Sequence, residues 1–194
     1  MFSKNYILIA KQLLQDTQLY LDKNNVLALV KIIDCEEKNK EQLYIIINFW
    51  VSNTFNDANS VIQLNDKESG VIICQGYLSE ISSNTGFLNQ YVISVKPVFK
   101  IDIKDNKIRV TYTVMNYEIN RSDGMLSNIT NKIINSPTHE VWPLNQTYPF
   151  NENDSHKKTS SKAFVSTIYY SADIINSLEN AVKEGVVGNE VDDW

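Results

Sequence analysis

The chain has 194 residues and carries 18 lysines and arginines against 23 aspartates and glutamates, a formal net charge of −5. Apolar residues make up 43% and charged residues 21%, so a mostly disordered chain is excluded. The length fits a single domain over residues 1–194. A general nucleic-acid binder needs a basic surface, and we therefore expect no nucleic-acid partner.

Two helices and a strand are predicted at the start of the chain. Residues 4–17 place apolar side chains at helical spacing, and residues 26–34 are rich in β-branched residues that favour a strand. A second helix is predicted over residues 40–55, with Trp50 on the stripe that packs against the sheet. This helix also carries apolar residues off the stripe that need a cover, namely Tyr44, Ile45 and Phe49.

Two hairpins follow the second helix. The first joins residues 61–64 to residues 71–78 through a charged turn, and residues 82–86 are predicted to be a loop. The second joins residues 91–104 to residues 107–117, where apolar and polar residues alternate on both sides of an Asp-Asn turn. This alternation predicts a sheet with one buried face and one face open to water.

The last third of the chain changes character. Residues 120–156 are rich in Asn, Ser, Thr and Pro and are predicted to be a long irregular insertion. A strong helical repeat predicts a helix over residues 160–184, which Ser160 or Ser161 would cap and Gly185 would end. The acidic tail, residues 186–194, is expected to be mobile.

These elements indicate an α+β fold in which helices pack on one face of an antiparallel β-sheet. Its core comprises residues 22–119 and the C-terminal helix. We expect that helix to lie beside the 40–55 helix on the same sheet face, covering its off-stripe residues and leaving the opposite face open. An apolar patch left uncovered would be a dimer surface, so a homodimer is possible.

The candidates for chemistry are few. Cys35 and Cys74 lie in separate apolar runs, and we expect buried, reduced thiols; a disulfide between neighbouring strands is the alternative. His139 and His156 are expected to be solvated loop residues. No nucleotide-binding or nucleophile motif is present, so we predict no catalytic residue, no metal site and no cofactor.

A partner surface is the more promising possibility. Three aromatic residues of the irregular stretch, Trp142, Tyr148 and Phe150, form either a contact surface or anchors that pin the stretch onto the domain. Lys100 and Arg109 lie on the predicted open face of the sheet and are the other candidates.

An ordered series of segments resembles one bacterial family of domains of unknown function with a TATA-binding-protein-like (TBP-like) fold. The series comprises Lys40–Tyr44, Ala58–Gln63, Asp66–Ile72 and Phe99–Val110. The resemblance extends over about residues 22–119 and 157–184. It implies a TBP-like sheet and, since such proteins typically carry a leader, a place in the cell envelope; it implies no catalytic residues.

The sequence itself predicts neither a signal peptide nor a transmembrane helix, because its apolar stretches are too short. Location is thus open between the cytoplasm and the periplasm or envelope. We expect a non-enzymatic binding or interaction module that recognises a protein or a small ligand. The alternatives are a structural or assembly subunit and an enzyme of unrecognised type with a site in the sheet cleft.

Overall fold

The computed structural model describes residues 5–16, 21–55, 61–133, 136–152 and 154–184. The chain folds into two compact units, which are described separately. Unit 1 comprises residues 1–28, 77–97 and 113–169. Unit 2 comprises residues 29–76, 98–112 and 170–194.

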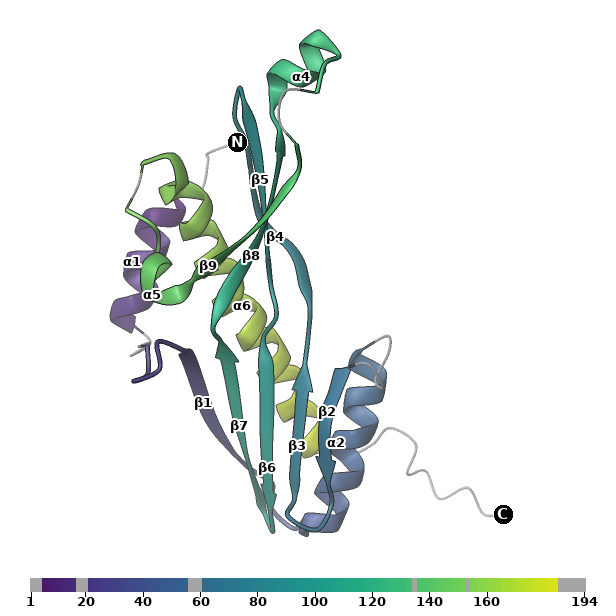
Figure 1. Cartoon of the computed structure of the whole chain (residues 1–194). Helices are drawn as coiled ribbons and strands as arrows, with labels where there is room; N and C mark the ends of the chain where they lie inside the picture. The colour runs from purple at the N-terminus through teal and green to yellow at the C-terminus, as the bar shows by residue number, and fades with distance from the viewer. Residues whose placement is uncertain (1–4, 17–20, 56–60, 134–135, 153, 185–194) are drawn as a thin grey trace. The chain divides into compact units, whose positions relative to one another are not determined.

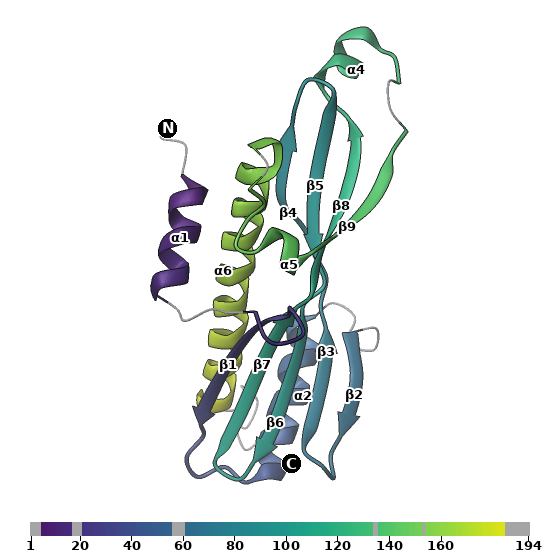
Figure 2. The same ribbon diagram turned by 60° about the vertical axis from the view of Figure 1, so that its left-hand side comes forward.

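Unit 2 is built on a five-stranded sheet with the strand order β1-β7-β6-β3-β2. Its elements, with the strands given in full, are β1 (Leu27–Asp34), α2 (Lys40–Thr54), β2 (Ile62–Asp66), β3 (Val71–Gln75), β6 (Val98–Lys104), β7 (Lys107–Val114) and the C-terminal part of α6 (Asp154–Glu184). The β2–β3 and β3–β6 pairs are antiparallel. Figures 1 and 2 show α2 and the C-terminal part of α6 on the same side of these strands.

The packing of unit 2 confirms that the two helices share one sheet face. Trp50 of α2 is 6% exposed, and its indole N–H donates to the hydroxyl of Ser177 on α6 at 3.0 Å. Phe55, which follows α2, contacts the ring of Phe99 on β6, with 6.2 Å between centroids. The capping box between Asn39 and Gln42 fixes the start of α2.

The prediction that the C-terminal helix covers the off-stripe residues of α2 is wrong. Ile45 is 57% exposed and Phe49 is 46% exposed, while the hydroxyl of Tyr44 donates to Asn65 at 2.5 Å. The reason is that α6 meets α2 on the side of Trp50, so it leaves the outward side of α2 uncovered.

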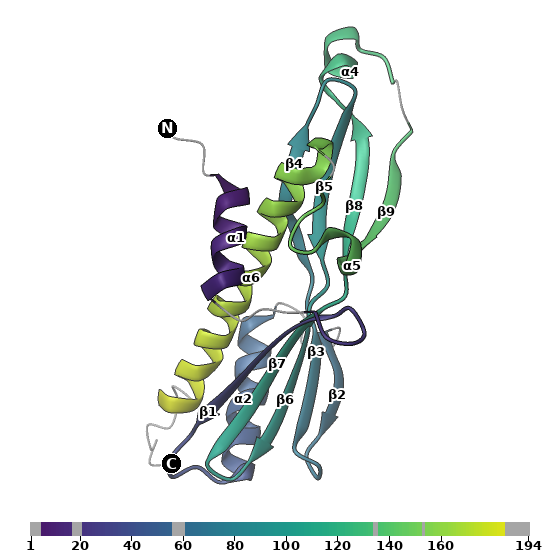
Figure 3. The same cartoon turned by 90° about the vertical axis from the view of Figure 1, so that its left-hand side faces the viewer.

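Unit 1 contains a four-stranded sheet with the order β4-β5-β8-β9. Its elements are α1 (Tyr6–Asp16), β4 (Leu78–Thr85), β5 (Asn89–Val95), β8 (Asn116–Asp123), α4 (Met125–Thr130), β9 (Thr138–Pro143), α5 (Leu144–Thr147) and the N-terminal part of α6. All three strand pairs are antiparallel. In Figure 3 the N-terminal part of α6 runs alongside this sheet, and the Ser82 hydroxyl of β4 donates to the Thr159 carbonyl of α6 at 2.8 Å.

Several local predictions in this part of the chain are wrong. Residues 82–85 are not a loop: they continue β4 and pair with β5. Ser82 can be buried there because its hydroxyl donates to the carbonyl of Thr159 on α6. The stretch 120–156 is not irregular: it holds the end of β8, then α4, β9, α5 and the start of α6. β9 pairs with β8 along its length, which its low apolar content does not reveal.

The predicted cap of the C-terminal helix is also wrong. α6 begins at Asp154, so Ser160 and Ser161 lie inside it. Their hydroxyls donate backwards to the carbonyls of His156 and Lys158 at 2.8 and 2.9 Å, as serines within helices do. Gly185, the tail 186–194 and positions 4 and 17 of the first predicted helix lie outside the described residues.

Candidate binding surface

The candidate surface is the face of the unit 2 sheet that lies opposite α2 and α6. Along β6 and β7, alternate residues are buried towards the helices: Phe99, Ile101, Ile103, Ile108, Val110 and Tyr112. The intervening residues point to the other face: Lys100, Asp102, Lys104, Lys107, Arg109 and Thr111. The predicted alternation is confirmed, and it gives this open face a row of charged side chains.

Asp102 organises the centre of the open face. Its carboxylate accepts hydrogen bonds from Lys100 at 2.7 Å and from both Nε and Nη2 of Arg109 at 3.0 and 2.8 Å. Partial burial acts to raise the pKa of Asp102, but the bonds from Lys100 and Arg109 outweigh it and hold the pKa below its usual value. The carboxylate therefore stays ionised and fixes both cations at the surface.

Two more lysines project beyond this cluster. Lys104 and Lys107 flank the Asp105–Asn106 turn, where Asn106 adopts a left-handed conformation with φ 63°. Asp105 turns away from them and accepts the backbone N–H of Lys40 at 2.7 Å. Neither Lys104 nor Lys107 has an ion-pair partner among the residues that the structure describes.

A depression of about 320 Å³ lies on this face. It is lined by residues of three neighbouring strands: Ile32 and Asp34 from β1, Asp102 and Lys104 from β6, and Lys107, Ile108 and Arg109 from β7. With Lys100, the face carries four cations against three carboxylates, because the strand register also places Asp66 of β2 on this face. Its local charge is +1 on a chain whose net charge is −5.

The open face is apolar along β1. Val30 is 60% exposed and Ile32 is 63% exposed, and both belong to the alternate set that points away from α6. A branched apolar pair beside a cationic row suits a partner that offers both apolar and acidic groups.

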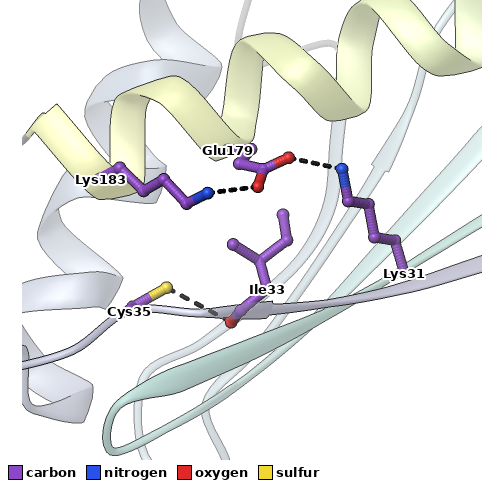
Figure 4. Close-up of polar contacts among 5 residues, drawn as sticks. All are labelled: Lys31, Ile33, Cys35, Glu179 and Lys183. Atoms are coloured by element: carbon purple, nitrogen blue, oxygen red, sulfur yellow. Dashed lines mark hydrogen bonds and ion pairs between the residues drawn. The ribbon is translucent and has the colours of Figure 1, made fainter.

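The other side of β1 is tied to α6 by an ion triad, shown in Figure 4. The carboxylate of Glu179 binds Lys31 at 2.5 Å and Lys183 at 2.6 Å. Hydrogen bonds from Lys183 and then from Lys31 lower the pKa of Glu179 to about 2. This triad is a structural contact between strand and helix, since both lysines are bound to the one carboxylate of Glu179.

Both cysteines are free and buried, as the sequence predicts. Burial raises the pKa of the Cys35 thiol, and it raises that of Cys74 to about 11. The Cys35 thiol donates to the Ile33 carbonyl at 3.5 Å (Figure 4). Both thiols are therefore poor nucleophiles at neutral pH.

The structure places the five predicted partner residues in different units. Lys100 and Arg109 lie on the open face of unit 2, whereas the three aromatic residues belong to unit 1. Phe150 is 4% exposed and Tyr148 stacks edge-on against Phe164 at 5.7 Å. This packing supports the interpretation that these two rings pin the segment onto the domain.

Trp142 of β9 is half-buried in a cluster around the start of α6. Its ring lies 4.8 Å from that of His156, and Tyr91 lies 4.9 Å from the same imidazole. His156 is thus not the solvated loop residue that the sequence suggested, because it sits on a helix against two rings. Burial lowers its pKa, although Glu140 acts in the opposite direction.

Sequence reasoning missed the contribution of β1 to the open face. Apolar residues occupy both odd and even positions of β1, so the sequence pattern does not reveal which face of this strand the helices cover. Ile32 and Asp34 join the surface only because β1 lies next to β7, and strand order is not a local property of the sequence.

The antiparallel sheets and the helices that cover them define an α+β protein with a TBP-like fold. Residues 30–118 match the model of a domain of unknown function with TBP-like fold, DUF4468, which confirms the resemblance seen in the sequence. The matched segment contains all of the charged open face.

Two crystal structures resemble most of the chain. A TBP-like protein from Parabacteroides distasonis has a TM-score of 0.53 at 12% identity, over 84% of this chain and 97% of that one. A DUF4468 family protein from Bacteroides ovatus has a TM-score of 0.53 at 13% identity, over 86% of this chain and 91% of that one. No curated protein matches the chain.

Among the described residues, no helix is both long and apolar enough to cross a membrane. No group of three or more His, Cys, Asp or Glu side chains that could hold a metal ion occurs in the same part of the chain.

Proposed function

We propose that the chain is a non-enzymatic binding module whose open sheet face in unit 2 recognises an acidic, partly apolar segment of a protein. The observation that carries this proposal is the excess of cations over carboxylates on that face, beside exposed Val30 and Ile32. A local charge opposite to that of the whole chain steers an acidic partner to this face and away from the rest of the surface.

Binding is favoured over catalysis by the state of the central carboxylate. Asp102 is held by two cations that keep its pKa low, so it is a weak general base. Arg109 donates from Nε and Nη2 to the same oxygen of Asp102, Oδ2, and its remaining N–H groups can donate to a second anion.

The probe for this proposal is a fluorescein-labelled peptide of alternating glutamate and valine, equal in length to β1. Fluorescence anisotropy measures its binding to the full chain and to a double variant, Lys104→Glu with Lys107→Glu. Both lysines are exposed, so the double variant keeps the core intact. We expect its affinity to fall about tenfold or more, since two attractive charges become repulsive.

A matched control carries the same change of net charge elsewhere. Lys132→Glu with Lys158→Glu alters two exposed lysines of unit 1 and should leave the affinity close to that of the parent. Equal losses in the two double variants, or no binding of the peptide to the parent, would contradict the proposal. Tighter binding of double-stranded DNA than of the peptide would replace the proposed partner by a nucleic acid.

The uncovered residues of α2 favour a second candidate, an assembly subunit. Ile45 and Phe49 lie one helical turn apart and are both about half exposed, which gives α2 an outward apolar pair. Sedimentation of the parent and of the Ile45→Glu variant tests this candidate. A dimer that the substitution dissociates would support it, and a monomeric parent would reject it.

We also propose a location in the periplasm or cell envelope, which rests on the family resemblance alone. Fractionation of cells that express the native gene, followed by detection of the protein in each fraction, tests it. Recovery with the cytoplasmic markers would contradict it.

A further inference from the structure

The two outer strands of the unit 2 sheet differ in a way that bears on binding. β1 has eight residues and β2 has five. β2 is rich in polar residues, whereas β1 reads Leu-Ala-Leu-Val-Lys-Ile-Ile-Asp, without proline or glycine. A long, apolar edge strand offers unpaired backbone groups to another strand, and natural proteins normally protect such an edge.

The direction of the backbone amides along β1 follows from one hydrogen bond. Cys35, which follows the last residue of β1, donates its backbone N–H at 2.8 Å to the carbonyl of Asn106, the turn residue just before β7. Because successive residues of a strand point their amides to opposite edges, the N–H groups of Val30 and Ile32 point away from β7. Among the described residues of unit 2, no further strand lies on this side of β1, and the isolated bridge from Leu21 is made to Leu27, before Val30.

The usual protection of an edge by a charged side chain is weakened here. Lys31 is the only lysine or arginine of β1, and its ammonium is bound to Glu179 on the helical side (Figure 4). Asp34 stands at the last position of the strand. The other two exposed side chains of β1 are apolar, and they are those of Val30 and Ile32.

We infer that β1 accepts an extended acidic segment of the partner as an additional strand of the unit 2 sheet. The inference rests on the proposed function, and it names the mode of recognition. Acidic side chains of the added strand lie on the open face, with their stems against Val30 and Ile32. Their carboxylates reach towards Lys107 and Arg109, which lie two strand spacings away, roughly 9.6 Å.

The charge of the open face decides the occupant. An acidic segment neutralises the local excess of cations, whereas a second copy of this chain would extend the sheet with the same cations and add no complementary charge. The added strand gains affinity from backbone hydrogen bonds, and the alternate acidic side chains provide specificity.

The test uses the glutamate-valine peptide in three forms: unmodified, N-methylated at every valine, and N-methylated at every glutamate. In an extended strand the amides of these two sets point to opposite edges. We expect one methylated form to bind about tenfold more weakly than the unmodified peptide or not at all, and the other to keep its affinity. Equal binding of all three forms would overturn strand addition while leaving the open face as a docking surface.

A pair of variants tests the same point from the side of the protein. Ile32→Pro removes the backbone N–H that points to the free edge, and proline is tolerated at such an edge of a sheet. Ile32→Val keeps this N–H and has a side chain of similar shape to isoleucine. We expect the peptide to bind Ile32→Val normally and Ile32→Pro about tenfold more weakly. Equal affinities of the two variants, with circular dichroism showing both folded, would overturn the inference.

Two further results separate this inference from the proposed function. Loss of binding in the Lys104→Glu, Lys107→Glu variant, together with insensitivity to N-methylation, would keep the proposed function and reject strand addition. A parent that sediments as a dimer, and that Ile32→Pro converts to a monomer, would identify a second copy as the occupant and overturn the inference.

Discussion

The indole N–H of Trp50 on α2 donates to the hydroxyl of Ser177 on α6 at 3.0 Å. This bond joins the two helices of unit 2 through residues that are 127 positions apart in the chain. We expect Trp50→Ala to lower the free energy of unfolding by about 3–5 kcal/mol, from lost burial and the cavity left behind. Urea denaturation measures it, and an unchanged midpoint would contradict the burial of this ring.

Trp50→Phe separates the bond from the packing. Phenylalanine keeps most of the buried ring surface but loses the bond to Ser177, an exposed residue whose hydroxyl water can then satisfy. The loss should therefore be smaller than that of the alanine variant, on the order of 1 kcal/mol.

The ion triad at Glu179 predicts a loss of stability in acid. The folded protein holds the pKa of Glu179 at about 2, below its ordinary value of 4.5. Its contribution is therefore complete above pH 4.5 and is lost as the pH falls towards 2. Urea midpoints across this range should fall less steeply for Glu179→Gln than for the parent.

The control for the triad is Glu68→Gln, which removes an exposed carboxylate from the turn between β2 and β3. It should keep the steep acid dependence of the parent. Parallel curves for the parent and Glu179→Gln would show that the triad does not contribute to stability.

His156 predicts a second pH dependence, nearer to neutrality. Burial against Tyr91 and Trp142 lowers its pKa, despite the nearby carboxylate of Glu140, so the unfolded chain binds the proton more tightly. Stability is thus complete above the ordinary value of 6.5 and decreases as the pH falls through it.

NMR titration of the imidazole and urea midpoints between pH 8 and pH 5 measure this effect, a range chosen to bracket the ordinary histidine pKa of about 6.5. His156→Gln should flatten the dependence, whereas His139→Gln on the exposed edge of β9 should not. A His156 titration at or above pH 6.5 would disprove the effect of burial.

The two thiols should be inert in the native protein. With the pKa of Cys74 raised to about 11 and that of Cys35 also raised, little thiolate exists at pH 8, and both side chains are buried. We expect a thiol reagent to label them slowly in buffer and rapidly in denaturant. Rapid labelling of the native chain would show that one of them is accessible.

The elements predicted correctly from sequence are those with strong periodicity. The alternation around Asp105–Asn106 identifies β6 and β7 and assigns Lys100 and Arg109 to the open face. The stripe that contains Trp50 identifies the buried side of α2. In both cases the local pattern reports directly which face meets the core.

Other features depend on contacts between distant segments and could not be predicted in this way. The sequence predicts one strand over residues 91–104, but the strand breaks before Val98, and its two halves join different sheets. Pro97 lies at this break, where it has no N–H to give to a sheet. The exposure of Ile45 and Phe49 likewise depends on where α6 packs, which the sequence of α2 does not encode.

The most direct test of the central claim is an NMR titration of the isotope-labelled full chain with the unmodified glutamate-valine peptide. The account predicts that the largest backbone shifts occur on the open face and its edge, at Val30, Ile32, Lys104, Lys107 and Arg109. Shifts confined to α2 or to unit 1, or none at saturating peptide, would contradict the assignment of the open sheet face as the binding surface.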